Sequence, residues 1–314
     1  MKRDHSIDAF RGIAILGMVF FTITLRLSRN LPDVLRHNSS GSVHLGDLIL
    51  PMFLFASGLS LAFFLNKKEM KQRKIFYRKA IGRFGKLALI GISLSFFSAN
   101  GFLEMDEVML SAILFIVCIA LSRFDWKFNL GVIFLISVSY IALMQLDKIG
   151  IFAGHYLGGY PAAFYYLPVM LTGLVIGKGI ISEGLWCKSN KIVSWAIFIF
   201  FLFFMISTPL DKMTVTPSFI MLSILFSIIM FSLVVMMISN FSSLKILQYI
   251  GKKPIRYWLL MYVVLLIPLW FYVEISDMSL PLNIQWYIGI LLSLGSILLL
   301  FAIYRFIDRI FVLN

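Results

Sequence analysis

The chain has 314 residues, of which 60% are hydrophobic and only 14% are charged. Soluble domains are about half apolar and about a quarter charged, so this composition excludes a soluble enzyme, a secreted disulfide scaffold and a disordered protein. The two cysteines fall in an apolar run and a short loop, which fits neither a disulfide framework nor a metal-ligand spacing. The sequence therefore predicts an all-α, polytopic membrane protein.

Apolar runs long enough to cross a bilayer recur along the whole chain, since a spanning helix needs about 20 residues. No fixed-period repeat, linker or low-complexity tract interrupts them, so we expect a single membrane domain over residues 1–314. Polar breaks between the runs define ten predicted spans, of which the fourth is short: residues 9–27, 47–65, 81–99, 108–122, 128–145, 163–181, 192–208, 217–238, 254–275 and 283–304.

The basic residues predict the orientation of these spans. With the N-terminus inside, all but five of the 28 lysines and arginines fall on inner segments. Such a bias is the positive-inside signal. The net charge of +13 is then explained by inner loops that face anionic lipid, and no nucleic acid is needed as a partner. We predict cytoplasmic N- and C-termini and a multi-pass location in the plasma membrane.

The first motif, SIDAFRGIAILGMVFF, covers residues 6–21. Asp8 and Arg11 are three residues apart and therefore share one face of a helix. Arg11 would lie at the inner boundary of the membrane, where a charge is costly unless it is paired or bound. Two interpretations stay open: Arg11 anchors the helix to lipid phosphates, or it is a fixed cation for an anionic ligand from the cytoplasm, oriented by Asp8.

The second motif, RHNSSGSVHLGDLILPMFLFASG, covers residues 36–58. Asp47 suits the start of a helix, where its carboxylate caps free N–H groups, and Pro51 would then fall in the first turn. Alternatively, His37 folds back over Asp47, and the pair frees one imidazole nitrogen as a base or nucleophile. His44 would compete for the same carboxylate. Both His44 and His155 also fit ordinary polar loop residues.

Together these motifs resemble the heparan-α-glucosaminide N-acetyltransferase family of the transmembrane acyltransferase superfamily, in its prokaryotic form with the catalytic membrane domain only. In that family D-x-x-R-G-I-A opens the first core span, and H-x9-D-L-x-x-P-x-F-x-F leads into the second. The resemblance implies that His37 is catalytic and that Asp47 is its acidic neighbour. Thr22 replaces a family Asn expected to contact substrate. Residues 167–178 and 251–264 resemble further family segments, with Lys253 in place of an Asn.

The resemblance also implies the reaction. An acetyl or other short acyl group would pass from a cytoplasmic CoA thioester, expected to be acetyl-CoA, to an amine or hydroxyl acceptor at the outer face, with a glycan as the expected class. His37 would either deprotonate the acceptor or carry the acyl group covalently, and the sequence does not separate these mechanisms. Basic residues expected to hold the CoA phosphates, with Asp8 as their partner, are Arg11, Arg83, Lys86, Lys252 and Lys253.

The remaining expectations concern contacts. Thr22, His44 and His155 are the predicted acceptor-binding residues. No metal is expected, because zinc-protease, P-loop and related motifs are absent from the sequence. The lipid bilayer and a second copy of the chain, as a homodimer, are the other predicted partners.

The competing function is a transporter or permease without catalytic activity. The number of spans, with Pro168 and Pro268 inside them, suits the interrupted helices of transporters. However, transporters place ionisable groups at the membrane midplane, whereas this sequence concentrates them at the two faces. The position of the polar groups therefore favours an enzyme.

Overall fold

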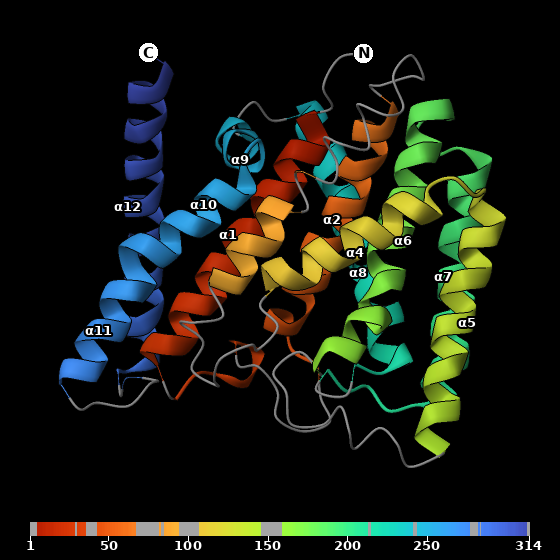
Figure 1. Cartoon of the computed structure of the whole chain (residues 1–314), viewed down its shortest axis with the longest axis horizontal. Helices are drawn as coiled ribbons and strands as arrows, with labels where there is room; N and C mark the ends of the chain where they lie inside the picture. The colour runs from red at the N-terminus through yellow and green to blue at the C-terminus, as the bar shows by residue number, and fades with distance from the viewer. Residues whose placement is uncertain are drawn as a thin grey trace. The chain divides into compact units, whose positions relative to one another are not determined.

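A computed structural model of the chain describes residues 5–28, 30–35, 43–66, 82, 85–93, 107–145, 159–212, 215–240, 244–276, 282 and 284–312. These residues form helices and no strands (Figure 1). The helices are α1 (His5–Leu27), α2 (Leu45–Asn66), α4 (Glu107–Leu121), α5 (Trp126–Gln145), α6 (Gly159–Glu183), α7 (Lys188–Ser207), α8 (Pro217–Asn240), α9 (Lys245–Gly251), α10 (Pro254–Met261), α11 (Ile267–Ile275) and α12 (Trp286–Val312).

Within the described ranges, eight helices are long and apolar enough to cross a membrane. They are α1, α2, α5, α6, α7, α8, the run α10–α11 and α12, and each corresponds to a predicted span. The predicted short span 108–122 is α4, with 15 residues. Most of the predicted span 81–99 lies outside the described residues, although residues 85–93 are helical. The prediction of an all-α polytopic membrane protein is confirmed, and the orientation of its termini stays a prediction.

Contacts between residues divide the chain into two compact units. The first unit comprises residues 1–3, 38–43 and 50–233, and the second comprises residues 4–37, 44–49 and 234–314. Each unit is described here by itself. The prediction of a single domain over residues 1–314 stays a prediction.

In the first unit, α2 and α6 pack backbone to backbone through glycines. A Cβ added to Gly173 would lie 2.2 Å from the Phe55 carbonyl oxygen, and one added to Gly58 would lie 2.0 Å from the Met170 carbonyl oxygen. Gly177, four residues after Gly173, also faces α2. Segments of the form G-x-x-x-G let membrane helices approach closely because hydrogen replaces a side chain at the contact. The family-like segment 167–178 is therefore a helix-packing motif.

Also in the first unit, a lysine side chain joins α6 to the end of α4. Lys178 Nζ donates hydrogen bonds to the main-chain carbonyls of Ser122 and Phe124, just beyond the end of α4. A cation at the C-terminal end of a helix satisfies exposed carbonyls and complements the helix dipole. This contact gives Lys178, which lies within the predicted span 163–181, a structural role.

In the second unit, α1 packs against both α9 and α12. Toward the C-terminal end of α1, the Thr24 hydroxyl donates to Ser293 Oγ on α12 at 2.8 Å. Ser28 lies against Gly289 of α12, where an added Cβ would lie 1.9 Å from Ser28 Oγ. Small side chains thus let α1 and α12 approach closely at this end of α1.

Among the described residues, prolines lie inside three of the spanning segments: Pro51 in α2, Pro168 in α6 and Pro268 in the run α10–α11. Pro268 follows a π-helical turn over Tyr262–Leu266, in which the Ile267 N–H donates to the Tyr262 carbonyl. This wider turn accommodates a residue that has no N–H of its own. The expected position of Pro51 in the first turn of its helix is wrong: α2 begins at Leu45, so Pro51 lies in the second turn. The helix starts earlier because Asp47 caps it from inside the first turn, as described below.

We expect Gly173→Ala to destabilise the protein by about 1–3 kcal/mol, the usual range for overpacking, because the added methyl meets the α2 backbone. Gly131→Ala on α5 is the matched control, since a Cβ there meets nothing within 4 Å and Ala favours a helix by up to about 1 kcal/mol. Thermal unfolding of the two purified variants in detergent measures the difference. Equal melting temperatures for both would contradict the glycine packing.

Candidate functional site

Asp47 lies in the first turn of α2 and is buried, with 1% of its surface exposed. Its Oδ2 accepts a hydrogen bond from the main-chain N–H of His44 at 3.0 Å, and its own N–H donates to the His44 carbonyl at 3.0 Å. This is the reach-back half of a capping box, which satisfies a donor at the start of a helix. The predicted capping role of Asp47 is therefore confirmed, and this contact uses the main chain of His44.

Asp47 lies close to the helix that carries Thr22. Gly17 of α1 contacts the Ile49 side chain, with an added Cβ only 3.1 Å from Ile49 Cδ1. Thr22 follows Gly17 by about 7.5 Å of helix, and Asp47 precedes Ile49 by two residues. The side chains of Thr22 and His44 are half-buried. Thr22, His44 and Asp47 therefore all lie in the second unit, near the contact between α1 and the first turns of α2.

Four other predicted site residues lie outside this region or outside the described residues. His37, His155 and Arg83 lie outside the described residues. Lys86 is described and exposed, but it belongs to the first unit. The catalytic role of His37 and the roles of the other three residues stay predictions.

Near the start of α1, Asp8 and Arg11 form the pair that their spacing predicts. Arg11 Nη1 lies 3.6 Å from Asp8 Oδ1, and the side chains are 21% and 4% exposed, respectively. The buried carboxylate thus holds a guanidinium that retains contact with solvent. Because the guanidinium has five N–H donors, it can bind a further anion while it stays beside Asp8.

Glycine contacts bring two more predicted cations to this end of α1. A Cβ on Gly251 of α9 would lie 1.7 Å from the Asp8 carbonyl oxygen, and one on Gly12 would lie 2.1 Å from the Leu247 carbonyl oxygen. Figure 1 shows α9 against the first turns of α1. Since Lys252 and Lys253 directly follow Gly251, the structure places them at the same end of α1 as Arg11. We call Arg11, Lys252 and Lys253 the basic cluster.

Lys253 differs from the rest of the basic cluster because it has a carboxylate partner on α12. Its Nζ lies 2.8 Å from Asp308 Oδ1, while the Tyr249 hydroxyl donates to Asp308 Oδ2 at 2.9 Å. Burial and the hydrogen bond to the Asp308 carboxylate raise the pKa of Tyr249 to about 12. Lys253 therefore shares the Asp308 carboxylate with the Tyr249 hydroxyl, and Lys252 is exposed beside it.

Two contributors to this region are absent from the sequence prediction. Arg256 is exposed on α10 and acts electrostatically on Asp308, and Asp308 ties α9 and α10 to α12. The helical spacing of Lys253 and Arg256, three residues apart, is a signal that could have identified Arg256. The pairing with Asp308 joins residues 55 positions apart, so no local pattern could have revealed it.

Among the described residues, no group of three or more His, Cys, Asp or Glu side chains is arranged to hold a metal ion. The two described clusters instead offer acid–base groups at Asp47 and anion-binding groups at Arg11 and Lys252.

Comparison with known proteins identifies one family. Residues 3–186 match the family model described as heparan-alpha-glucosaminide N-acetyltransferase, catalytic. The match covers more than half of the chain and includes both motifs on which the sequence resemblance is based. No curated protein matches the chain.

We expect Asp308→Asn to return the pKa of Tyr249 from about 12 toward its ordinary value of 10. The raised pKa stabilises the folded state fully below pH 10, and this contribution is lost as the pH rises toward 12. The phenolate absorbance is measured at rising pH for the wild type and for Asp308→Asn. Subtracting the absorbance of the same protein with Tyr249→Phe leaves the titration of Tyr249 alone. An unchanged titration in Asp308→Asn would show that the carboxylate does not control Tyr249.

Proposed function

Because the chain belongs to the family of heparan-alpha-glucosaminide N-acetyltransferase catalytic domains and is an integral membrane acetyltransferase, we propose that it moves an acetyl group from acetyl-CoA to an acceptor across the bilayer. The donor is supplied from the cytoplasm, and the acceptor is an amine or hydroxyl, of glycan class, at the outer face of the plasma membrane. The family match carries this proposal. It also favours an enzyme over the transporter considered from the sequence.

The basic cluster supports binding of the donor. CoA carries phosphates, and charge-assisted hydrogen bonds to phosphate are among the stronger polar contacts in proteins. Arg11 offers a planar fork of donors beside Asp8, and Lys252 is exposed next to it. Lys253 contributes less to this proposal than its neighbours because Asp308 pairs with it. Arg83 and Lys86 stay candidate phosphate contacts.

The acceptor end of the proposal involves His37, Asp47 and the neighbouring polar residues. In direct transfer, His37 takes the proton of the acceptor, whose oxygen or nitrogen attacks the thioester carbonyl. The carbon–sulfur bond then breaks, and the CoA thiolate leaves and takes up a proton. In the covalent alternative, the imidazole nitrogen itself attacks the thioester carbonyl, and the carbon–sulfur bond breaks. The acceptor then takes the acetyl group from the imidazole and gives up its proton, and the CoA thiolate that left takes up a proton.

Asp47 contributes to either mechanism by its charge and position. A buried carboxylate near an imidazolium stabilises the positive charge that His37 acquires in both routes. The hydrogen bond from the His44 main chain fixes the Asp47 carboxylate, so that its position is preorganised. Thr22, His44 and His155 are the proposed contacts to the acceptor.

The proposed reaction can be tested in proteoliposomes with acetyl-CoA labelled in the acetyl group. Acetyl-CoA is supplied on one side of the bilayer, and a panel of amino and hydroxyl sugars is supplied on the other. We expect labelled sugar to appear only when the donor faces the N-terminal side of the protein. Transfer that requires both substrates on the same side would contradict transfer across the bilayer, and transport of an unmodified sugar would favour the permease.

We expect His37→Ala to lower acetyl transfer by about 10²–10⁴-fold, the usual contribution of a general acid–base residue. His5→Ala is the matched control, since His5 is exposed at the start of α1 and has no proposed role. The transfer rate is measured with equal amounts of folded protein, judged by size-exclusion chromatography. Near-normal turnover in His37→Ala would move the catalytic assignment to His44 or His155.

We expect Arg11→Gln to raise the donor KM by about 10- to 100-fold, since a hydrogen bond to a charged group contributes about 1.5–3 kcal/mol. The acceptor KM should hardly change, because the acceptor binds at the opposite face. Lys245→Gln is the control, because Lys245 is exposed at the start of α9, which packs against α1, and it has no proposed role in donor binding. An unchanged donor KM in Arg11→Gln would return Arg11 to a role as an interfacial anchor paired with Asp8.

A further inference from the structure

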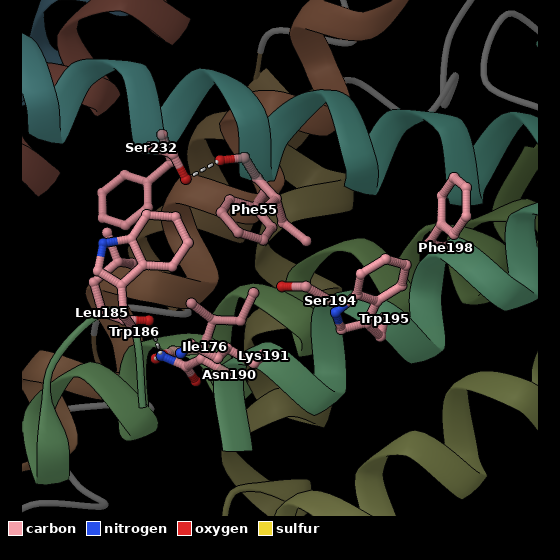
Figure 2. Close-up of a pocket in the computed structure, with 12 residues that line it drawn as sticks. Phe55, Ile176, Leu185, Trp186, Asn190, Lys191, Ser194, Trp195, Phe198 and Ser232 are labelled. Carbon is pink, nitrogen blue, oxygen red and sulfur yellow. Dashed lines mark hydrogen bonds between the residues drawn. The ribbon is translucent and has the colours of Figure 1, made fainter. Parts of the chain in front are cut away.

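The first unit contains a pocket of about 370 Å³ (Figure 2). Its walls come from α2, α6, α7 and α8, together with the turn before α7. None of the residues predicted to bind the donor or the acceptor lines it. The lining is mostly apolar: Phe55, Ile176, Leu185, Trp186, Asn190, Lys191, Ser194, Trp195, Phe198, Ile228, Phe231 and Ser232.

The pocket lies beside an apolar surface of α7 that is exposed in the first unit. Only 22% of the apolar window of α7 is buried inside the protein. Trp195 and Phe198, which line the pocket, are 66% and 39% exposed, and further along the same helix Ile206 is 90% exposed. In an integral membrane protein such a surface is covered by hydrocarbon, so lipid has direct access to the pocket.

The length of the pocket matches one leaflet of a bilayer. Its lining on α7 runs from Asn190 to Phe198, which is about 12 Å along a helix. One half of the hydrocarbon core is about 15 Å thick. Figure 2 shows Trp186 toward one end of the pocket and Phe198 at the other. The pocket therefore extends from the start of α7 into the depth occupied by an acyl chain.

The end of the pocket near the start of α7 has the chemistry of a lipid headgroup region. Trp186 is 66% exposed there, and tryptophan favours the membrane–water interface. Lys191 lines the same pocket and is exposed, so its ammonium group can reach a phosphate. Basic residues at this level attract anionic lipids.

Hydrogen bonds from two polar side chains of the lining hold the walls of the pocket in place. The buried Asn190 amide donates to the carbonyls of Ile176 and Leu185 at 3.3 and 3.1 Å, linking the turn before α7 to α6. The Ser232 hydroxyl donates to the Ile228 carbonyl at 2.9 Å, within α8. Asn190 Oδ1, at the end near the start of α7, has no hydrogen-bond partner among the described residues. From there to Phe198 the lining is mostly apolar, so the part of a ligand that fills the interior is apolar.

We propose that this pocket binds one anionic phospholipid, with an acyl chain between α7 and α8 and the phosphate at Lys191. The apolar interior, the length of one leaflet and the single lysine at the headgroup end together match this class of molecule. The proposal concerns a lipid held by the first unit and does not depend on the acetyl-transfer mechanism.

Native mass spectrometry of the full-length protein, after exchange into detergent with phosphatidylglycerol or phosphatidylcholine, tests the proposal. We expect wild-type protein to retain one phosphatidylglycerol in preference to phosphatidylcholine. Lys191→Gln should weaken phosphatidylglycerol binding about fivefold, the effect of one basic residue near a lipid phosphate. Ile228→Trp should weaken binding of both lipids, because the larger side chain occupies part of the pocket.

Two variants on the same helices are the controls. Lys188 is exposed on α7 and Ile229 is exposed on α8, and neither lines the pocket. Lys188→Gln and Ile229→Trp should therefore leave the bound lipid unchanged. Equal losses from Lys191→Gln and Lys188→Gln would overturn the proposal, and so would displacement of the lipid by acetyl-CoA or by dimer formation. If Ile228→Trp does not fold, as judged by thermal unfolding, the lysine pair alone decides.

Discussion

The contact between Gly251 and the main chain of Asp8 is the constraint on which the basic cluster depends. A Cβ at Gly251 would lie 1.7 Å from the Asp8 carbonyl oxygen, so only glycine allows α9 to approach α1 this closely. The contact joins residues that are far apart in the chain and fixes where the chain emerges from α9. Lys252 and Lys253 follow at once, beside a helix end that already carries Arg11.

Within the second unit, each described carboxylate near these cations has a defined partner. Asp8 holds Arg11 at 3.6 Å, and Asp308 holds Lys253 at 2.8 Å. Such pairing lowers the free-energy cost of charges at a membrane boundary, and it leaves the cations unequal. Arg11 has five N–H donors in its guanidinium and stays 21% exposed beside Asp8. Lys253, in contrast, serves mainly to connect α10 with α12.

The two units use small residues in the same physical way, although they support different proposals. In the first unit, Gly58, Gly173 and Gly177 bring α2 and α6 together, and the packed helices support a wall of the lipid pocket. In the second unit, Gly12 and Gly251 bring together the residues proposed to bind CoA phosphates. Helices in a membrane gain little from excluding lipid, so close backbone packing is a main source of their association.

The sequence by itself determined the class of the protein, eight of the spans and the shared face of Asp8 and Arg11, because hydropathy and helical periodicity are local properties. It also predicted the family, from residues in two short motifs. Only the tertiary structure decided that Lys253 is paired with Asp308 and that a pocket lies along α7. Each of these results depends on contacts between segments that are far apart in the chain. The pairing of distant helices and the close approach of glycines are not encoded in a local pattern.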